Sequence, residues 1–285
     1  MADIRLIVTD LDGTFLTGHN DPHPENVRAL KEAQQAGILV CACTGRAWNM
    51  CRHVVKKSGF DRYTITSGGS AIVDAHTQQP LFQRTMQPTA LLPLLYTAWR
   101  TGIARMDVFN TAFTGSFGQG LEDKVLRVRV RNAVMPQDEW EDFRAYRKFL
   151  DLFYAMEDKS ELVYLTTGNE RGDMPDKLRE IIDALDAFDL TVSAAGCIDV
   201  LPRGCDKSTA LIRLCRMLGI AREEVLAIGD QENDIPMLRW AGVGVAMGQS
   251  DEKVKRAADR VTAHYKDAGV AKAIYEVALD YCFDD

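Results

Sequence analysis

The chain begins with a short apolar run that ends in two carboxylates. Residues 4–9 read Ile-Arg-Leu-Ile-Val-Thr, and the sequence Asp-Leu-Asp-Gly-Thr follows directly at residues 10–14. A nearly continuous apolar run of this length is typical of a strand that is buried on both faces, as in a parallel sheet. Open α/β sheets bind ligands at the carboxyl ends of their strands, so we expect Asp10 and Asp12 to lie where a ligand binds. The alternative is that both aspartates only shape a turn.

Strands and helices alternate in both halves of the chain. A helix predicted at about residues 25–36 precedes a strand at 38–43, and a strand at 225–228 precedes a helix and a strand at 243–247. This order predicts an α/β fold with a doubly wound, parallel, Rossmann-like sheet. The segment between the halves is as long as a domain. We therefore expect a core of residues 1–85 and 194–285, interrupted by an inserted α+β cap of residues 86–193.

Composition and charge limit the classes of partner. The 285 residues carry a net charge of −7, which argues against nucleic-acid binding as the main task. No apolar run approaches the roughly 20 residues that span a bilayer, and the N-terminus lacks the features of a signal peptide. The seven cysteines follow no disulfide or zinc pattern. We expect a cytoplasmic protein without a nucleic-acid or membrane partner, and the oligomeric state stays open.

Polar residues also follow the second predicted strand. Thr44-Gly45-Arg46 comes directly after Cys43, and a hydroxyl with close backbone N–H groups is suited to holding phosphoryl oxygens. We include Gly45 and Arg46 with Thr44 among the candidate phosphate-binding residues. The same residues are also ordinary turn chemistry at the end of a strand.

A helix predicted over residues 207–218 begins with an unusual pair of residues. Asp206 is suited to capping the helix, and Gly219 ends it. Lys207, however, places a cation at the positive end of the helix dipole. A bound anion, phosphate or carboxylate, would remove this conflict. The alternative is a lysine that extends into water.

The strand predicted at 225–228 ends in a further polar segment. Asp230 follows it, and Asn233 and Asp234 come shortly after. With Asp10, Asp230 can complete an oxygen-only metal site, because Mg²⁺ prefers carboxylate, carbonyl and water ligands. Such a cation would also relieve the repulsion between neighbouring carboxylates. Taken alone, Asn233 and Asp234 can instead cap the next helix.

The candidate nucleophile is a carboxylate rather than a serine or a histidine-activated group. An ordinary carboxylate is ionised at neutral pH, so Asp10 as a nucleophile needs no adjacent general base. The five histidines follow no nucleophile–base pattern, and the chain lacks both a Gly-x-Ser-x-Gly sequence and a Walker lysine motif. Serine-hydrolase and P-loop chemistry therefore do not fit.

Together and in this order, the four segments resemble the motifs of the haloacid dehalogenase-like superfamily. More narrowly, the chain resembles the Cof-like phosphatases, in which a cap is inserted between the second and third motifs. The resemblance implies that Asp10 is the nucleophile and forms an aspartyl-phosphate. It implies that Asp12 protonates the leaving alcohol and then activates water. It also implies that Mg²⁺ is held by Asp10, by the backbone carbonyl of Asp12 and by Asp230, with Asp234 in support.

The same resemblance implies that Thr44 and Lys207 grip the phosphoryl group and that Asn233 helps to orient the site. The implied function is Mg²⁺-dependent hydrolysis of a phosphate monoester of a small metabolite, with a sugar phosphate first among the candidates. A phosphomutase of the same superfamily and a non-catalytic regulator that binds a phosphorylated metabolite are the alternatives. The chain departs from the family pattern in two loops, where it has Ser-Gly-Gly at 67–69 and Tyr-Lys-Asp-Ala-Gly-Val at 265–270.

Three arginines of the inserted segment alternate with apolar residues. Arg127, Arg129 and Arg131 are spaced as on one face of a strand. That face is either a solvated outer surface or a surface that holds the non-reacting part of an anionic or polyhydroxylated substrate. Caps in the resembling family cover the pocket and set substrate choice, which favours the second interpretation.

Overall fold

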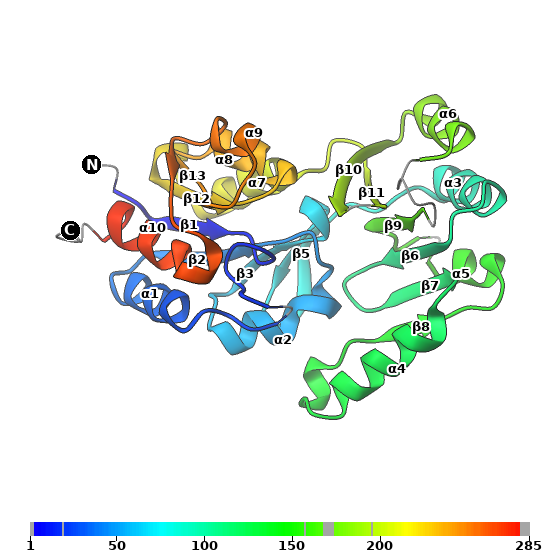
Figure 1. Cartoon of the computed structure of the whole chain (residues 1–285), viewed down its shortest axis with the longest axis horizontal. Helices are drawn as coiled ribbons and strands as arrows, with labels where there is room; N and C mark the ends of the chain where they lie inside the picture. The colour runs from blue at the N-terminus through cyan, green and yellow to red at the C-terminus, as the bar shows by residue number, and fades with distance from the viewer. Residues whose placement is uncertain (1–2, 19, 157, 168–173, 195, 280–285) are drawn as a thin grey trace. The chain divides into compact units, whose positions relative to one another are not determined.

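The chain is divided between two units, each with its own sheet (Figure 1). The structure is a computed structural model that describes residues 3–18, 20–156, 158–167, 174–194 and 196–279. Unit 1 comprises residues 1–44, 54–81 and 206–285, and unit 2 comprises residues 45–53 and 82–205. Within the described residues, no helix is long and apolar enough to cross a membrane.

Unit 1 is built on an eight-stranded sheet with the order β14-β13-β12-β1-β2-β3-β4-β5. The strands are β1 Leu6–Thr9, β2 Leu39–Cys43, β3 Tyr63–Thr66, β4 Ala71–Asp74, β5 Gln79–Gln83, β12 Val225–Gly229, β13 Val243–Ala246 and β14 Arg260–Val261. β1 pairs in parallel with both β12 and β2, so that Thr9 lies beside Ile228 and Ala42. Every residue of β1 and β12 is buried, as the apolar runs predict for strands covered on both faces.

Helices cover both faces of this sheet. Figure 1 shows α7, α8 and α9 on one side and α1 and α10 on the other. Their bounds are α1 Pro24–Gln35, α7 Lys207–Leu218, α8 Ile235–Trp240, α9 Glu252–Lys255 and α10 Gly269–Val277. A further helix, α2 (Trp48–Ser58), begins among residues of unit 2 and ends among residues of unit 1. The predicted doubly wound α/β sheet is confirmed, as are the helices expected near 25–36 and at 207–218.

Unit 2 is built on a six-stranded, mainly antiparallel sheet with the order β10-β11-β9-β6-β7-β8. Its strands are β6 Arg105–Phe109, β7 Thr114–Gly118, β8 Phe143–Ala145, β9 Leu162–Thr166, β10 Phe188–Ala194 and β11 Cys197–Pro202. Apolar residues of the strands, among them Met106, Val163 and Leu165, form one core with residues of α3 (Pro88–Arg100), α5 (Phe149–Met156) and α6 (Asp176–Leu185). β11 pairs with both β10 and β9, so this unit continues past the expected boundary at residue 193.

The segment of unit 2 in which arginines alternate with apolar residues is a helix, so the strand predicted there is wrong. Residues Leu121–Asn132 form α4, with acidic residues in its first turn and Arg129 and Arg131 in its last, a distribution that favours a helix. Positions two apart on a helix are separated by about 200°, so Arg127 and Arg131 share one side and Arg129 lies on another. The three arginines therefore do not form the predicted common face.

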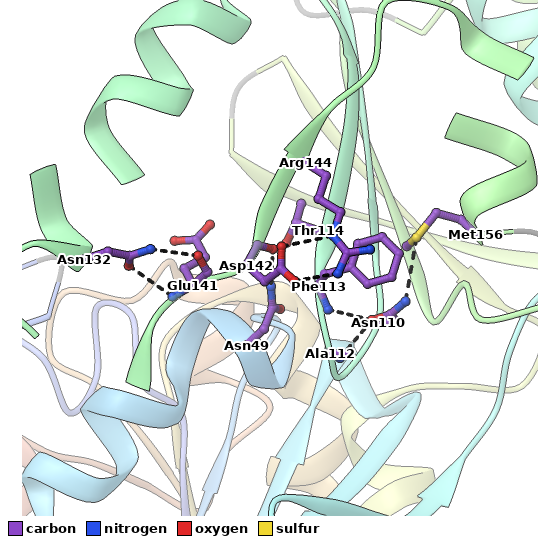
Figure 2. A network of polar contacts seen from close by, with 10 residues as sticks. All are labelled: Asn49, Asn110, Ala112, Phe113, Thr114, Asn132, Glu141, Asp142, Arg144 and Met156. Carbon is purple, nitrogen blue, oxygen red and sulfur yellow. Dashed lines mark hydrogen bonds and ion pairs between the residues drawn. The ribbon is translucent and has the colours of Figure 1, made fainter. Parts of the chain in front are cut away.

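Side-chain hydrogen bonds join the segment 45–53 to the sheet of unit 2 (Figure 2). The Asn49 amide donates to the Thr114 hydroxyl at 3.0 Å and to the Asp142 carbonyl at 3.3 Å. Beside this contact, Asn132 at the end of α4 both donates to and accepts from the backbone of Glu141. The two bonds from Asn49 connect the first turn of α2 to unit 2, with which it groups.

Candidate active site

Three aspartates meet at the carboxyl ends of neighbouring parallel strands. Asp10 directly follows β1, Asp230 directly follows β12, and Asp234 lies in the short 3-10 helix η4 (Glu232–Asp234). One carboxylate oxygen of each lies within 4.8 Å of the others, and all three residues are buried. The sequence predicts this meeting, because the carboxyl ends of adjacent parallel strands share one edge of a sheet.

Lys207 reaches the same cluster from the first turn of α7. Its Nζ donates to Oδ1 of Asp10 at 2.6 Å and to Oδ1 of Asp234 at 2.5 Å, and the residue is only 2% exposed. The expected conflict with the helix dipole is thus resolved by carboxylates of the protein itself, and the lysine does not extend into water. The helix begins as predicted, with the Asp206 side chain accepting from the amide of Thr209 at 2.7 Å.

The cluster carries more negative than positive charge, since it holds three carboxylates and one ammonium group, which pairs with Asp10 and Asp234. Burial raises the pKa of Asp10; Lys207 opposes this shift, and the neighbouring Asp234 and Asp230 add to it. Burial and then Asp234 raise the pKa of Asp230 to about 6. Burial acts to lower the pKa of Lys207, but Asp10 and Asp234 raise it well above its ordinary value. Another cation would therefore stabilise the ionised carboxylates.

The donor set fits a hard divalent cation such as Mg²⁺, which takes oxygen ligands. A carboxylate has about four acceptor positions, so the bond from Lys207 leaves Asp10 able to bind a metal. Asp234 is more fully engaged, because one oxygen accepts from Lys207 and the other accepts from the amides of Asp230 and Gln231. The geometry thus favours Asp10 and Asp230 as ligands and Asp234 as their support.

Asp12 lies in the turn after β1, and its side chain is exposed. The following residue, Gly13, has a φ of +76°, and a Cβ there would lie 2.5 Å from Oδ2 of Asp230. Glycine is therefore required for the turn to pass this close to Asp230. Thr14 completes the contact, donating from its hydroxyl to Oδ1 of Asp230 at 2.7 Å.

Two other candidate site residues of unit 1 are Thr44, which follows β2, and Asn233, which lies in η4. Thr44 is buried directly after β2, and its amide donates to the carbonyl of Ile65 at 2.9 Å. Asn233 is partly buried in η4, and its buried Oδ1 has no hydrogen-bond partner within the part of the chain that the structure describes. The carboxamide of Asn233 therefore keeps hydrogen-bonding capacity for a ligand. Gly45, which follows Thr44, is grouped with unit 2.

The candidate arginines belong to unit 2. Arg46 and Arg131 both act electrostatically on the buried carboxylate of Glu141, and the guanidinium of Arg131 lies 3.0 Å from Oε2 of Glu141. Arg127 and Arg129 are exposed on α4. Arg131 therefore pairs with Glu141, on which Arg46 also acts electrostatically, whereas Arg127 and Arg129 remain exposed.

Sequence reasoning missed two residues that hold the turn after β1. Thr14 is one, since its hydroxyl binds Asp230 although it stands in the same short run as Asp10 and Asp12. The other is Gln249, whose Nε2 donates to the Gly13 carbonyl at 2.6 Å. Nothing local indicates this contact, because the two residues are 236 positions apart in the chain.

The unusual loop at residues 67–69 has a steric explanation. Ser67–Gly69 forms the 3-10 helix η1, and all three residues have positive φ. A Cβ on Gly69 would overlap the carbonyl oxygen of Asp206, at the start of α7. Glycine at position 69 therefore lets this loop approach the helix that carries Lys207.

Comparison with known proteins assigns the family. The sequence profile of haloacid dehalogenase-like hydrolases matches residues 7–274. The chain belongs to this family. It is 29% identical over 275 residues to the 5-amino-6-(5-phospho-D-ribitylamino)uracil phosphatase of Bacillus subtilis, with 96% of this chain and 95% of the relative covered.

Further members of the family agree with this assignment. The HMP-PP phosphatase of Serratia proteamaculans is 30% identical, with 88% of this chain and 86% of the relative covered. A solved haloacid dehalogenase-like hydrolase from B. subtilis superposes with a TM-score of 0.80 at 27% identity, covering 96% of this chain and 100% of that one. The resemblance inferred from the four motifs is confirmed, and the chain is an enzyme of the phosphatase class.

Proposed function

We propose that this phosphatase is Mg²⁺-dependent and cleaves the phosphate monoester of a small metabolite, with a sugar phosphate as the leading candidate. The observation that carries the proposal is the excess of buried carboxylate where β1 and β12 end, with Lys207 bridging Asp10 and Asp234. The relatives support the substrate class, because one of them is named for a phosphorylated ribitylamino compound.

In the proposed reaction, a carboxylate oxygen of Asp10 attacks phosphorus while the bond from phosphorus to the ester oxygen breaks. Asp12 gives its proton to the departing alkoxide, which leaves as an alcohol. Water then attacks the phosphorus of the aspartyl-phosphate, Asp12 takes a proton from that water, and inorganic phosphate leaves Asp10 regenerated. Lys207 serves the first step, because its ammonium group at 2.6 Å favours the ionised and reactive form of Asp10.

Asp10, Asp230 and the backbone carbonyl of Asp12 are the proposed metal ligands. Asp234 supports the metal ligands by accepting hydrogen bonds from Lys207 and from the backbone amide of Asp230. Bound Mg²⁺ would neutralise charge on the phosphoryl oxygens. The proposed contacts to the transferred phosphoryl group are Thr44, Gly45, Lys207 and Asn233.

We assign the choice of substrate to unit 2, and within it first to Arg46 and Arg131. Their shared interaction with Glu141 supports this assignment, because it gathers charged groups at one place in the unit. Replacing Arg131 with glutamine is expected to lower the specificity constant for the physiological substrate, with p-nitrophenyl phosphate hydrolysis largely retained, because a small artificial substrate lacks the remote contacts. Equal losses on both substrates would assign Arg131 a purely structural role.

The test of the proposed function is turnover of a broad panel of phosphorylated metabolites with Mg²⁺, ranked by specificity constant. Chelator is expected to abolish phosphate release, Mg²⁺ to restore it, and Ca²⁺ to substitute poorly, since Ca²⁺ prefers more ligands at longer distances. Full activity in excess chelator, or no turnover of any panel member, would contradict the proposal. A retained phosphoenzyme that depends on a bisphosphate activator would indicate a phosphomutase instead.

A further inference from the structure

The turn that carries Asp12 is tethered to a distant part of the chain by Gln249. The side-chain amide of Gln249 donates to the Gly13 carbonyl at 2.6 Å, and its oxygen accepts from the backbone amide of Tyr265 at 3.1 Å. Gln249 is partly buried between these two backbone segments. One carboxamide thus uses its donor and its acceptor to join the catalytic turn to the loop at residues 265–270.

A second carboxamide makes a similar bridge nearby. The Nδ2 of Asn26 donates to the Phe15 carbonyl at 3.0 Å, and its Oδ1 accepts from the amide of Ala271 at 3.0 Å. Asn26 is fully buried. Residues 13 and 15 are therefore both joined to the segment 265–271, and this segment contains the second loop in which the chain departs from the usual family pattern.

The bridge from Gln249 bears directly on the acidic cluster. Gly13 lies against Asp230, and the next residue, Thr14, donates to the Asp230 carboxylate at 2.7 Å. Rotation of the Gly13–Thr14 peptide would therefore move the Thr14 hydroxyl relative to Asp230. Because Asp12 directly precedes Gly13, a shift of Gly13 itself would also displace Asp12. Fixing the Gly13 carbonyl opposes both movements.

We propose that Gln249 is a positioning residue for the reaction, fixing the Gly13–Thr14 peptide and through it the carboxyl group of Asp12. The proposal rests on the proposed role of Asp12 as the acid and base. It goes beyond the family motifs because the tether joins the catalytic turn to the unusual loop that begins at Tyr265. Displacement of a reacting group by about 1 Å can cost on the order of 100-fold in rate, so a tether of this kind has a measurable effect.

Two substitutions separate the hydrogen bonds from mere packing. Gln249→Met keeps the length of the side chain and removes both hydrogen bonds. Gln249→Glu, when ionised, still accepts from Tyr265 but presents a negative oxygen to the Gly13 carbonyl. When protonated, the same glutamate offers an O–H donor and a carbonyl acceptor, and so reproduces both bonds.

The kinetic test compares an alkyl phosphate with p-nitrophenyl phosphate. Gln249→Met is expected to lower kcat on the alkyl phosphate by about 10- to 100-fold, with KM changed little, and to lower it less on p-nitrophenyl phosphate, whose leaving group needs little protonation. The activity of Gln249→Glu relative to the wild type is expected to rise as the pH falls. Gln35→Glu, at an exposed position of α1, is the matched control and is expected to show a constant ratio.

Amide hydrogen exchange tests the tether without relying on activity. Exchange in a peptide covering residues 10–16 is expected to be faster in Gln249→Met, with β2 unchanged. Unchanged exchange would show that Gln249 does not hold the turn. Faster exchange with an unchanged kcat, or equal losses of kcat on both esters, would show that Gln249 does not position Asp12. If Gln249→Met does not fold, Gln249→Glu at low and neutral pH provides the same comparison. A wild-type enzyme that hydrolyses no ester would refute the proposed function, while exchange would still decide whether Gln249 holds the turn.

Discussion

Each unit of the molecule buries charged side chains at its sheet, and the two groups differ in their balance of charge. In unit 2, Asp107 on β6 is 1% exposed and lies 3.0 Å from a side-chain nitrogen of both Arg105 and Lys124, while its other oxygen accepts from the Ser116 hydroxyl. In unit 1, Lys207 pairs with buried Asp10 and Asp234, and the carboxylate of Asp230, also buried, lies beside these two. Cations thus outnumber the carboxylate in the first group, and carboxylates outnumber the ammonium in the second.

We propose that this difference separates a structural cluster, in unit 2, from a binding site, in unit 1. A buried carboxylate that contacts two cations has the partners that compensate for its burial. Buried carboxylates that outnumber their cations repel one another, and their ionised forms become favourable only when a further cation binds. Substitution at Asp10 is therefore expected to affect chemistry, and substitution at Asp107 is expected to affect stability.

The largest effect is expected from Asp10→Asn, because an amide cannot replace the nucleophilic carboxylate. Phosphate release from any substrate is expected to fall by about 10³-fold or more, with the melting temperature retained. Steady-state kinetics and a thermal melt make the comparison. Residual activity within about tenfold of the wild type, a loss of only about 1.4 kcal/mol in transition-state stabilisation, would remove Asp10 from the role of nucleophile.

Asp12→Asn is expected to have the next largest effect. Loss of a general acid and base costs about 10²–10⁴-fold, and the loss is expected to be smaller for p-nitrophenyl phosphate than for an alkyl phosphate. The measurement is the ratio of the two kcat values in the variant and in the wild type. An identical loss on both esters would argue against protonation of the leaving group by Asp12.

Asp107→Asn tests the opposite side of the comparison. Breaking a buried ion pair by removing one partner costs about 3–5 kcal/mol, and part of this cost is avoided here because Arg105 and Lys124 are partly exposed. We expect the free energy of unfolding of unit 2 to fall by about 2–3 kcal/mol, while Mg²⁺-dependent hydrolysis of p-nitrophenyl phosphate continues. Denaturant unfolding and an assay of the same sample measure both. An Asp107→Asn variant that keeps full stability but no longer depends on Mg²⁺ would contradict the structural role assigned to the Asp107 cluster.

The smallest effect is expected from a change that alters no charge. Ala268 directly precedes α10 and has a φ of +54°, a conformation that costs a residue with a Cβ roughly 1–2 kcal/mol. Ala268→Gly is expected to raise the free energy of unfolding by about 0.5–1 kcal/mol, since the greater flexibility of unfolded glycine offsets part of the gain. Its Mg²⁺ dependence is expected to equal that of the wild type, and a shifted dependence would show that the backbone here influences the metal site.

The sequence predicted best what depends on strands and their ends. The apolar runs that identify β1 and β12 predict that Asp10 and Asp230 lie together, because ligands collect at the carboxyl ends of parallel strands. The alternation around Arg127, Arg129 and Arg131 was misleading, because it also suits a helix with acidic residues at its start and arginines at its end. The expected boundary at residue 193 differs from the structure, in which unit 2 continues to residue 205 because β11 pairs with β10 and β9. Nothing in the sequence around residue 193 indicates this pairing.

Contacts between segments far apart in the chain were beyond prediction. The Gln249–Gly13 hydrogen bond depends on how two loops meet in the folded protein, and neither loop carries a periodic signal for it. The two bonds from Lys207 to Asp10 and Asp234 were only partly anticipated. The helix dipole indicated that an anion lies beside Lys207, and the fold determined that the anions are carboxylates of the protein itself.

The most direct test of the central claim is the response of the melting temperature to Mg²⁺ in three proteins, the wild type, Asp230→Asn and Asp107→Asn. A ligand present at 100 times its dissociation constant stabilises the folded state by about 2.7 kcal/mol. Mg²⁺ is expected to raise the melting temperature of the wild type and of Asp107→Asn by similar amounts and to have little effect on Asp230→Asn. A wild type that does not respond to Mg²⁺, or an Asp230→Asn variant that responds as the wild type does, would contradict a metal site at this cluster.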